Sequence, residues 1–165
     1  MSALRLLAVC AAMAAPVAVW AGDPSGFDTA GFDQCFAAAT SDNGRADCIQ
    51  DAGEKCEAFV ADRFPEVSQV DRTLNCLDAE RQHLDARLGE TYDKLKADEQ
   101  ERGAERADAL VTMERAWIAF RDARCAYDKI TNGHGTGGIV FEPMCLRDET
   151  GRQLILLTNY QSQRN

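Results

Sequence analysis

The sequence predicts an all-α protein, namely a small disulfide-stapled helical bundle built around an antiparallel helix hairpin, with an N-terminal cysteine-rich helical extension. Three observations predict this class. Leucines and aromatic residues recur at three- and four-residue steps through most of the chain, as on the buried face of a helix. Strand-like alternation is confined to residues 139–141, which are too few to matter. Six cysteines follow a signal-like N-terminus, which favours disulfides.

Residues 1–21 have the features of a secretory signal peptide: Arg5, an apolar run and small residues at the end. Val19 and Ala21 fit the −3 and −1 positions of a signal-peptidase site, so the mature chain is expected to begin at the next residue. The apolar run is too short to span a bilayer. A lipoprotein interpretation through Cys10 is less favoured, because a valine precedes it where a small residue is expected.

Removal of this segment takes away Cys10 and leaves an even number of cysteines, which in an exported chain implies disulfides. The six are Cys35, Cys48, Cys56, Cys76, Cys125 and Cys145. No C-x2-C pair occurs among them, so neither a zinc site nor a thioredoxin-like redox site is expected. We therefore expect a protein that uses no metal ion and no cofactor.

The mature chain is expected to be strongly acidic. The whole sequence has a formal charge of −9, and residues 1–21 contribute one base and no acid, which leaves −10 for the rest. Such a surface disfavours nucleic acid and anionic lipid as partners and favours cationic partners. Composition leaves the oligomeric state open.

The region before the main domain divides into two parts. Residues 22–33 lack helical periodicity and are expected to form a flexible leader, with order beginning near Phe32. Residues 34–70 form the predicted cysteine-rich extension. It contains a short helix that ends at the turn residues 41–44, followed by a second helix over about residues 45–62.

Residues 71–163 form the predicted main helical domain. Ser68 can accept a hydrogen bond from the backbone of Asp71, which would start the longest helix and let it run to about Glu101. One face of this helix carries Leu74, Leu77, Leu84, Leu88, Tyr92 and Leu95. A break at Gly103 would return the chain antiparallel and is preferred. One continuous helix is the alternative, since a single glycine costs only about 1 kcal/mol.

The next helix is expected over about residues 105–130. Its predicted core face consists of Leu110, Met113, Trp117, Phe120 and Tyr127, whereas Glu114, Arg115, Arg121 and Asp122 are expected to point elsewhere. A glycine-rich segment follows at residues 131–138. Pro143 then suits the first turn of a final helix.

Two short motifs give the chain a family resemblance. Trp117, Arg121-Asp122 and Cys125 form the pattern W-x3-RD-x2-C, and the preceding helix carries Cys76 and Glu80 as C-x3-E. With these motifs the region of about residues 71–160 resembles the N-terminal domain of LprI-type lysozyme-inhibitor-like proteins. The resemblance implies a small, exported, helical and disulfide-bonded binding protein, with lysozyme inhibition as the family's named activity and the periplasm as its expected location.

One departure from the family pattern lies in the long helix. The family often carries L-N-x2-Y there, whereas this chain has glycine at position 89, between Leu88 and Tyr92. The cysteine-rich segment also extends beyond the core pattern. We expect Tyr92, like the other motif residues, to serve the structure of the domain.

The cysteines can pair in fifteen ways. Cys125 and Cys145 lie at the end of one predicted helix and the start of the next, and the resemblance includes both, so a bridge between them is preferred. Cys35 with Cys48 and Cys56 with Cys76 would join neighbouring helices and are also preferred. Pairing of Cys35 with Cys76 stays open.

The candidate binding site is the segment of residues 131–142. Inhibitors of lysozyme usually insert a loop into the catalytic cleft, and here the loop offers His134 and Glu142 as polar contacts and Ile139 and Phe141 as apolar ones. A cationic cell-wall hydrolase such as lysozyme is the expected partner.

The other motif residues are interpreted as structural. Arg121 is expected to span two helices toward an acidic residue such as Glu80, and Trp117 and Phe120 are expected in the core. No enzymatic activity is expected, because His83 is interpreted as a surface or boundary residue and neither histidine has a catalytic context. A structural or scaffolding role in the envelope, without inhibitory activity, is the alternative function.

Overall fold

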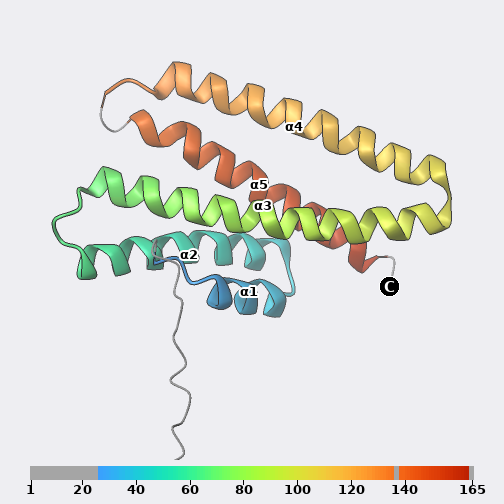
Figure 1. The fold of residues 1–165 in the computed structure, drawn as a ribbon, viewed down its shortest axis with the longest axis horizontal. Helices are drawn as coiled ribbons and strands as arrows, with labels where there is room; N and C mark the ends of the chain where they lie inside the picture. Colours follow the sequence, from blue (N-terminus) through green and yellow to red (C-terminus); the bar gives the residue numbers. More distant parts are fainter. Residues whose placement is uncertain (1–25, 136–137, 164–165) are drawn as a thin grey trace, which may run out of the picture.

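The computed structural model describes residues 26–135 and 138–163, which form five α-helices and one 3-10 turn (Figure 1). In chain order these are α1 (Thr29–Ala38), α2 (Asp42–Arg63), α3 (Gln69–Arg102), α4 (Ala104–Asn132), η1 (Gly138–Val140) and α5 (Phe141–Ser162). These residues contain no strand, so the all-α prediction is confirmed. None of these helices is long and apolar enough to cross a membrane. The predicted signal peptide lies outside the described residues.

The most extensive contacts between helices join α3, α4 and α5 into a bundle. Helices α3 and α4 run antiparallel, and α5 packs against both (Figure 1). Helix α2 packs on α3 on the side away from α4, and α1 packs on α2. The fully buried leucines at the centre are Leu84, Leu95, Leu154 and Leu157. The core therefore lies chiefly between α3 and α5, with α4 and α2 covering its two sides.

The α3–α4 hairpin depends on the conformation of one glycine. Gly103 has φ +137° and ψ +140° between the two helices. This region of backbone space is essentially restricted to glycine, because a Cβ would clash with the adjacent peptide groups. The preferred hairpin is thereby confirmed over a single continuous helix. The start of α3 also follows the prediction, since the Ser68 hydroxyl accepts the Asp71 amide hydrogen bond at 3.2 Å.

The leader prediction is wrong for the part of residues 22–33 that the structure describes. Phe27 is 4% exposed, and the Asp28 carboxylate accepts the Gly31 amide at 2.9 Å, which starts α1 at Thr29. The Phe27 and Phe32 rings lie 5.7 and 5.2 Å from the His83 ring on α3. Burial of these two aromatic rings offsets the entropy of ordering the segment, which helical periodicity alone could not indicate.

The predicted core face of α4 is wrong at two positions. Phe120 and Tyr127 are 56% and 66% exposed, whereas Trp117 packs partly buried against the core as expected. The buried residues of α4 are Ala107, Leu110, Glu114 and Cys125. The predicted stripe follows a seven-residue repeat, which drifts by about 20° per repeat around a straight helix. The observed buried positions 107, 110, 114 and 125 are 3, 4 and 11 residues apart, which stays closer to the helical period of 3.6 residues.

Three disulfides staple consecutive helices. Cys35–Cys48 joins α1 to α2, Cys56–Cys76 joins α2 to α3, and Cys125–Cys145 joins α4 to α5. These are the pairs preferred from the sequence, and the open alternative of Cys35 with Cys76 does not occur. Since the α3–α4 hairpin links the remaining neighbours, every helix is tied covalently or by a tight turn to the next.

Candidate functional site

The candidate binding loop lies at one end of the bundle, between the last turn of α4 and the first turn of α5 (Figure 1). The Cys125–Cys145 disulfide closes its base. The backbone at Gly138 lies close to the backbone at Gly133. A Cβ built on Gly138 would be only 2.4 Å from the carbonyl carbon of Gly133. Residues 136 and 137 lie outside the described part of the chain. The loop is therefore short, tightly folded at its base and fixed at both ends.

Four large apolar side chains are exposed at this end of the molecule. They are Ile130 (71%), Tyr127 (66%), Ile139 (49%) and Phe141 (41%). We call these four residues, together with His134, the loop-end surface. Exposure of that many large apolar groups near one loop is typical of an interaction site. Two of the four, Tyr127 and Ile130, were not included in the site predicted from the sequence.

The two polar residues predicted for this site differ in how free they are to contact another molecule. His134 is exposed in the loop. Glu142, in the first turn of α5, forms an ion pair of 2.7 Å with Lys129 in the last turn of α4. Glu142 is therefore half-buried and already neutralised by a cation of the same molecule. This ion pair joins α4 to α5 at the loop.

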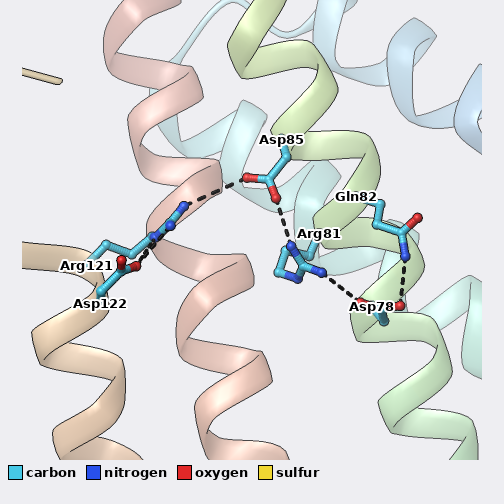
Figure 2. Close-up of polar contacts among 6 residues, drawn as sticks. All are labelled: Asp78, Arg81, Gln82, Asp85, Arg121 and Asp122. Atoms are coloured by element: carbon cyan, nitrogen blue, oxygen red, sulfur yellow. Dashed lines mark hydrogen bonds and ion pairs between the residues drawn. The ribbon is translucent and has the colours of Figure 1, made fainter. Parts of the chain in front are cut away.

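The motif residue Arg121 belongs to a chain of polar contacts between α4 and α3 (Figure 2). Its guanidinium lies 3.9 Å from the Asp85 carboxylate, which in turn accepts a 2.8 Å hydrogen bond from Arg81. Arg81 also bonds Asp78 at 2.8 Å, and Arg121 bonds its neighbour Asp122 at 2.9 Å. Arg121 thus spans two helices, but the predicted partner Glu80 is wrong.

The same arginine shields the motif tryptophan. The guanidinium of Arg121 lies over the Trp117 ring, 5.0 Å from its centroid, at a distance that permits a cation–π interaction. Trp117 and Tyr92 are partly buried against the core from opposite helices. Together these residues line a groove of about 420 Å³ between α3 and α4. The motif residues Trp117 and Arg121 therefore lie at the interface between α3 and α4.

Glu80, the acid of the C-x3-E motif, pairs with a different arginine. It is fully buried, and its Oε2 lies 3.0 Å from Nη1 of Arg147 on α5. Arg147 also contacts Asp148 at 2.6 Å. Burial raises the pKa of the Glu80 carboxyl to about 7, although the Arg147 charge and hydrogen bond act in the opposite direction. The free-energy cost of burying the ionised Glu80 carboxylate therefore exceeds the stabilisation that Arg147 provides.

A family model described as "Lysozyme inhibitor LprI" matches residues 65–156. The chain belongs to the LprI lysozyme-inhibitor family. The match covers α3, α4, the disulfide-closed loop and most of α5. Neither the curated proteins nor the solved structures contain a significant match to the chain. Helices α1 and α2 both precede the region that matches the LprI family.

Sequence reasoning missed a second buried acid of the LprI region. Glu114 is 8% exposed and accepts a 2.6 Å hydrogen bond from the Gln153 amide on α5. Burial raises its carboxyl pKa, while this hydrogen bond acts to lower it. The sequence did contain a signal for this burial. Position 114 lies four residues after Leu110 and three before Trp117, which places Glu114 on the same helix face as these two core residues. Two further buried acids are Glu149, which contacts Arg124 and Arg152, and Glu99, which contacts Arg106.

Charge is distributed unevenly over the LprI region and its extension. Helix α2 carries six acidic and three basic residues, whereas α4 carries five of each. The two helices lie on opposite sides of α3 (Figure 1). Helix α3 carries nine acidic and six basic residues, so the excess of acids lies on α2 and α3 and not on α4.

Proposed function

We propose that this protein is an exported binding protein of the cell envelope, without catalytic activity of its own, that inhibits a cationic lysozyme or a related cell-wall hydrolase. Membership of the LprI family is the observation that carries the proposal. Three disulfides suit an exported protein, and the periplasm is the compartment we propose.

The loop-end surface is the part of the molecule that we propose to contact the hydrolase. Aromatic and large aliphatic anchors supply most of the binding energy in protein interfaces, and Tyr127, Ile130, Ile139 and Phe141 are exposed together near the loop. The Cys125–Cys145 bridge supports this role, because a preordered loop loses less entropy on binding.

The charge of the mature chain supports a cationic partner. A net charge near −10 attracts a positively charged protein over long range, which raises the association rate more than it lowers the dissociation rate. Since the loop-end surface is mainly apolar and both α2 and α3 carry more acidic than basic residues, we assign steering to the acidic surface of these two helices and anchoring to the loop end.

The test is inhibition of purified cationic lysozymes by the oxidised mature protein, residues 22–165. The double variant Ile139→Ala/Phe141→Ala should weaken inhibition by about tenfold or more, equivalent to about 1.4 kcal/mol. The matched control Ile118→Ala/Leu156→Ala removes two apolar side chains of similar exposure from elsewhere on the helices, and it should inhibit normally. Inhibition should also weaken as salt is raised.

Failure of well-folded, fully oxidised protein to inhibit any lysozyme would contradict the proposal. A role as a structural or scaffolding protein of the envelope would then be favoured, and it would be sought by identifying envelope proteins that co-purify with the chain. Equal loss of inhibition in the two double variants would keep the inhibitor function and reject the loop-end surface as its site.

A further inference from the structure

A second concave site lies between α2, α3 and α5. It encloses about 440 Å³, which is enough for one long side chain of another protein. Its charged lining residues are Glu54 and Glu57 on α2, Glu80 on α3, and Arg147, Asp148 and Arg152 on α5. We call it the α2–α3–α5 pocket. It is distinct from the loop-end surface, although Met144 of its lining follows Phe141 by one turn of α5.

The buried end of this pocket presents an acceptor that lacks a donor. Glu80 is fully buried, and its Oε2 accepts from Arg147 at 3.0 Å. Its other oxygen, Oε1, has no hydrogen-bond partner among the residues that the structure describes. Buried carboxylate oxygens are nearly always paired, because an unpaired one retains the cost of desolvation. The arrangement therefore suits a ligand that brings an N–H donor.

Gly53 keeps the space beside the Glu80–Arg147 ion pair open. A Cβ built on Gly53 would lie 3.0 Å from Glu80 Oε2 and 3.4 Å from Arg147 Nη1. Any side chain at this position of α2 would therefore press on the ion pair and occupy part of the pocket. Glycine at this position gives the pocket access to the Glu80 carboxyl.

The arginines of the pocket are already engaged, whereas the acids of α2 are not neutralised. Arg147 contacts both Glu80 and Asp148, and Arg152 contacts Glu149 outside the pocket. Glu54 and Glu57 accept hydrogen bonds from the neutral donors Gln50 and Thr73, at 3.0 Å each. The carboxylates of Glu54 and Glu57 therefore add to that of Glu80, and the pocket carries an excess of negative charge. We call Glu54 and Glu57 the rim of the pocket.

We propose that the α2–α3–α5 pocket binds the guanidinium group of an arginine side chain presented by the partner protein, with Glu80 Oε1 as the inner acceptor and Glu54 and Glu57 as the outer ones. Guanidinium suits this position better than ammonium, because it is more weakly hydrated and offers five donors in a planar fork. That the partner protein supplies the arginine rests on the proposed inhibition of a hydrolase. That the pocket binds a guanidinium group does not depend on that function.

Binding should depend on pH in a direction that follows from the inner carboxyl. Burial raises the Glu80 pKa to about 7, and a guanidinium pairs with the ionised form only. Affinity should therefore increase by about tenfold between pH 6 and pH 8, as Glu80 changes from mostly protonated to mostly ionised. The other charged groups that line the pocket are Glu54, Glu57, Arg147, Asp148 and Arg152.

The experiment titrates acetyl-arginine amide into the oxidised mature protein and follows the amide signal of Gly53 by NMR, with calorimetry for the affinity. Acetyl-citrulline amide is the matched probe, because it has the same shape without the charge. We expect saturable binding of the arginine probe alone, stronger at pH 8 than at pH 6. Glu80→Gln should abolish both the binding and its pH dependence.

Two further variants keep the test independent of any folding defect at Glu80. Glu54→Gln/Glu57→Gln changes the rim, and Asp51→Asn/Asp62→Asn makes the same change in net charge at exposed positions of α2 outside the pocket lining. The rim variant should weaken probe binding by at least fivefold, whereas the control should bind as the parent does. Equal effects of the two variants, equal binding of the citrulline probe, or no response at Gly53 would overturn the proposal.

Lysozyme inhibition by the same variants separates this proposal from the proposed function. Normal inhibition without any arginine binding would reject the pocket and leave the inhibitor function standing. Arginine binding without any inhibition would support the pocket and remove the hydrolase as the source of the side chain. Loss of inhibition in the rim variant, but not in its control, would support both.

Discussion

The Glu80 carboxylate on α3 lies 3.0 Å from the Arg147 guanidinium on α5, and the acid is completely buried. The pair crosses the interface at which most of the core leucines meet. Removing one member of a buried pair leaves an uncompensated charge, which is strongly destabilising. Glu80 therefore contributes to the attachment of α5, and it reaches that helix instead of α4, where Arg121 was its predicted partner.

A double-mutant cycle should detect this pairing. Glu80→Gln and Arg147→Met should be coupled by about 1 kcal/mol or more, because the two groups are in direct contact. Glu80→Gln and Arg121→Met should be additive within about 0.5 kcal/mol, because Arg121 contacts Asp85 instead. The measurement is urea denaturation of the four proteins of each cycle at pH 8. Strong coupling to Arg121 alone would contradict the assignment.

The stability of the protein should fall as pH rises from about 4.5 to about 7. The Glu80 carboxyl keeps its proton up to a pKa of about 7 in the folded protein and loses it near the ordinary value of 4.5 when unfolded. The folded state then binds more protons across this interval, so raising the pH favours unfolding by at most about 1.4 kcal/mol per pH unit. Glu114, whose pKa is also raised, acts in the same direction.

The contribution of Glu80 is isolated by comparing variants. Glu80→Gln should flatten the pH dependence of the free energy of unfolding between pH 4.5 and pH 7, whereas Glu54→Gln at the exposed rim should leave it as in the parent. Chemical denaturation at half-unit pH intervals measures the slopes. If the free energy of unfolding changes with pH equally steeply in the parent and in Glu80→Gln, the assigned pKa shift is refuted.

The two aromatic residues of the α4 motif region should differ sharply in their effects on stability. Trp117→Ala should destabilise the protein by about 2–3 kcal/mol, because the ring packs against the core beneath Arg121. Phe120→Ala should change stability by less than about 0.5 kcal/mol, since its side chain is 56% exposed. Thermal and urea unfolding would check both values. Similar losses of stability in the two variants would indicate that Phe120 is buried in the core.

The Cys125–Cys145 bridge should matter for stability and for the loop. Its cysteines are 20 residues apart, so loop-closure entropy predicts that the double serine variant loses about 3 kcal/mol of stability. Inhibition of lysozyme should weaken as well, because the loop would lose its fixed base. The matched control, Cys35→Ser/Cys48→Ser, releases α1 from α2 and should lower the melting temperature while leaving inhibition intact. Equal inhibition by both variants would argue against an ordered loop as the binding element.

Local chemistry predicted the elements of this fold well, because their signals act within a few residues. The Ser68–Asp71 cap starts α3, Gly103 ends it, and the three disulfides join the helices nearest in sequence. The candidate site was predicted in part. Ile139, Phe141 and His134 are exposed at the loop as expected, but Tyr127 was assigned to the core because it follows Phe120 by seven residues, and Phe120 is itself exposed.

The sequence by itself determined the class of the fold and the acidic charge, and it favoured the helix hairpin and the three disulfides, since each depends on composition or on residues close together in the chain. Tertiary structure alone decided which face of α4 is buried, which arginine pairs with Glu80 and how three helices enclose a pocket around that acid. These features depend on helix rotation and on contacts across dozens of residues, so small angular differences between packed helices select among chemically equivalent partners.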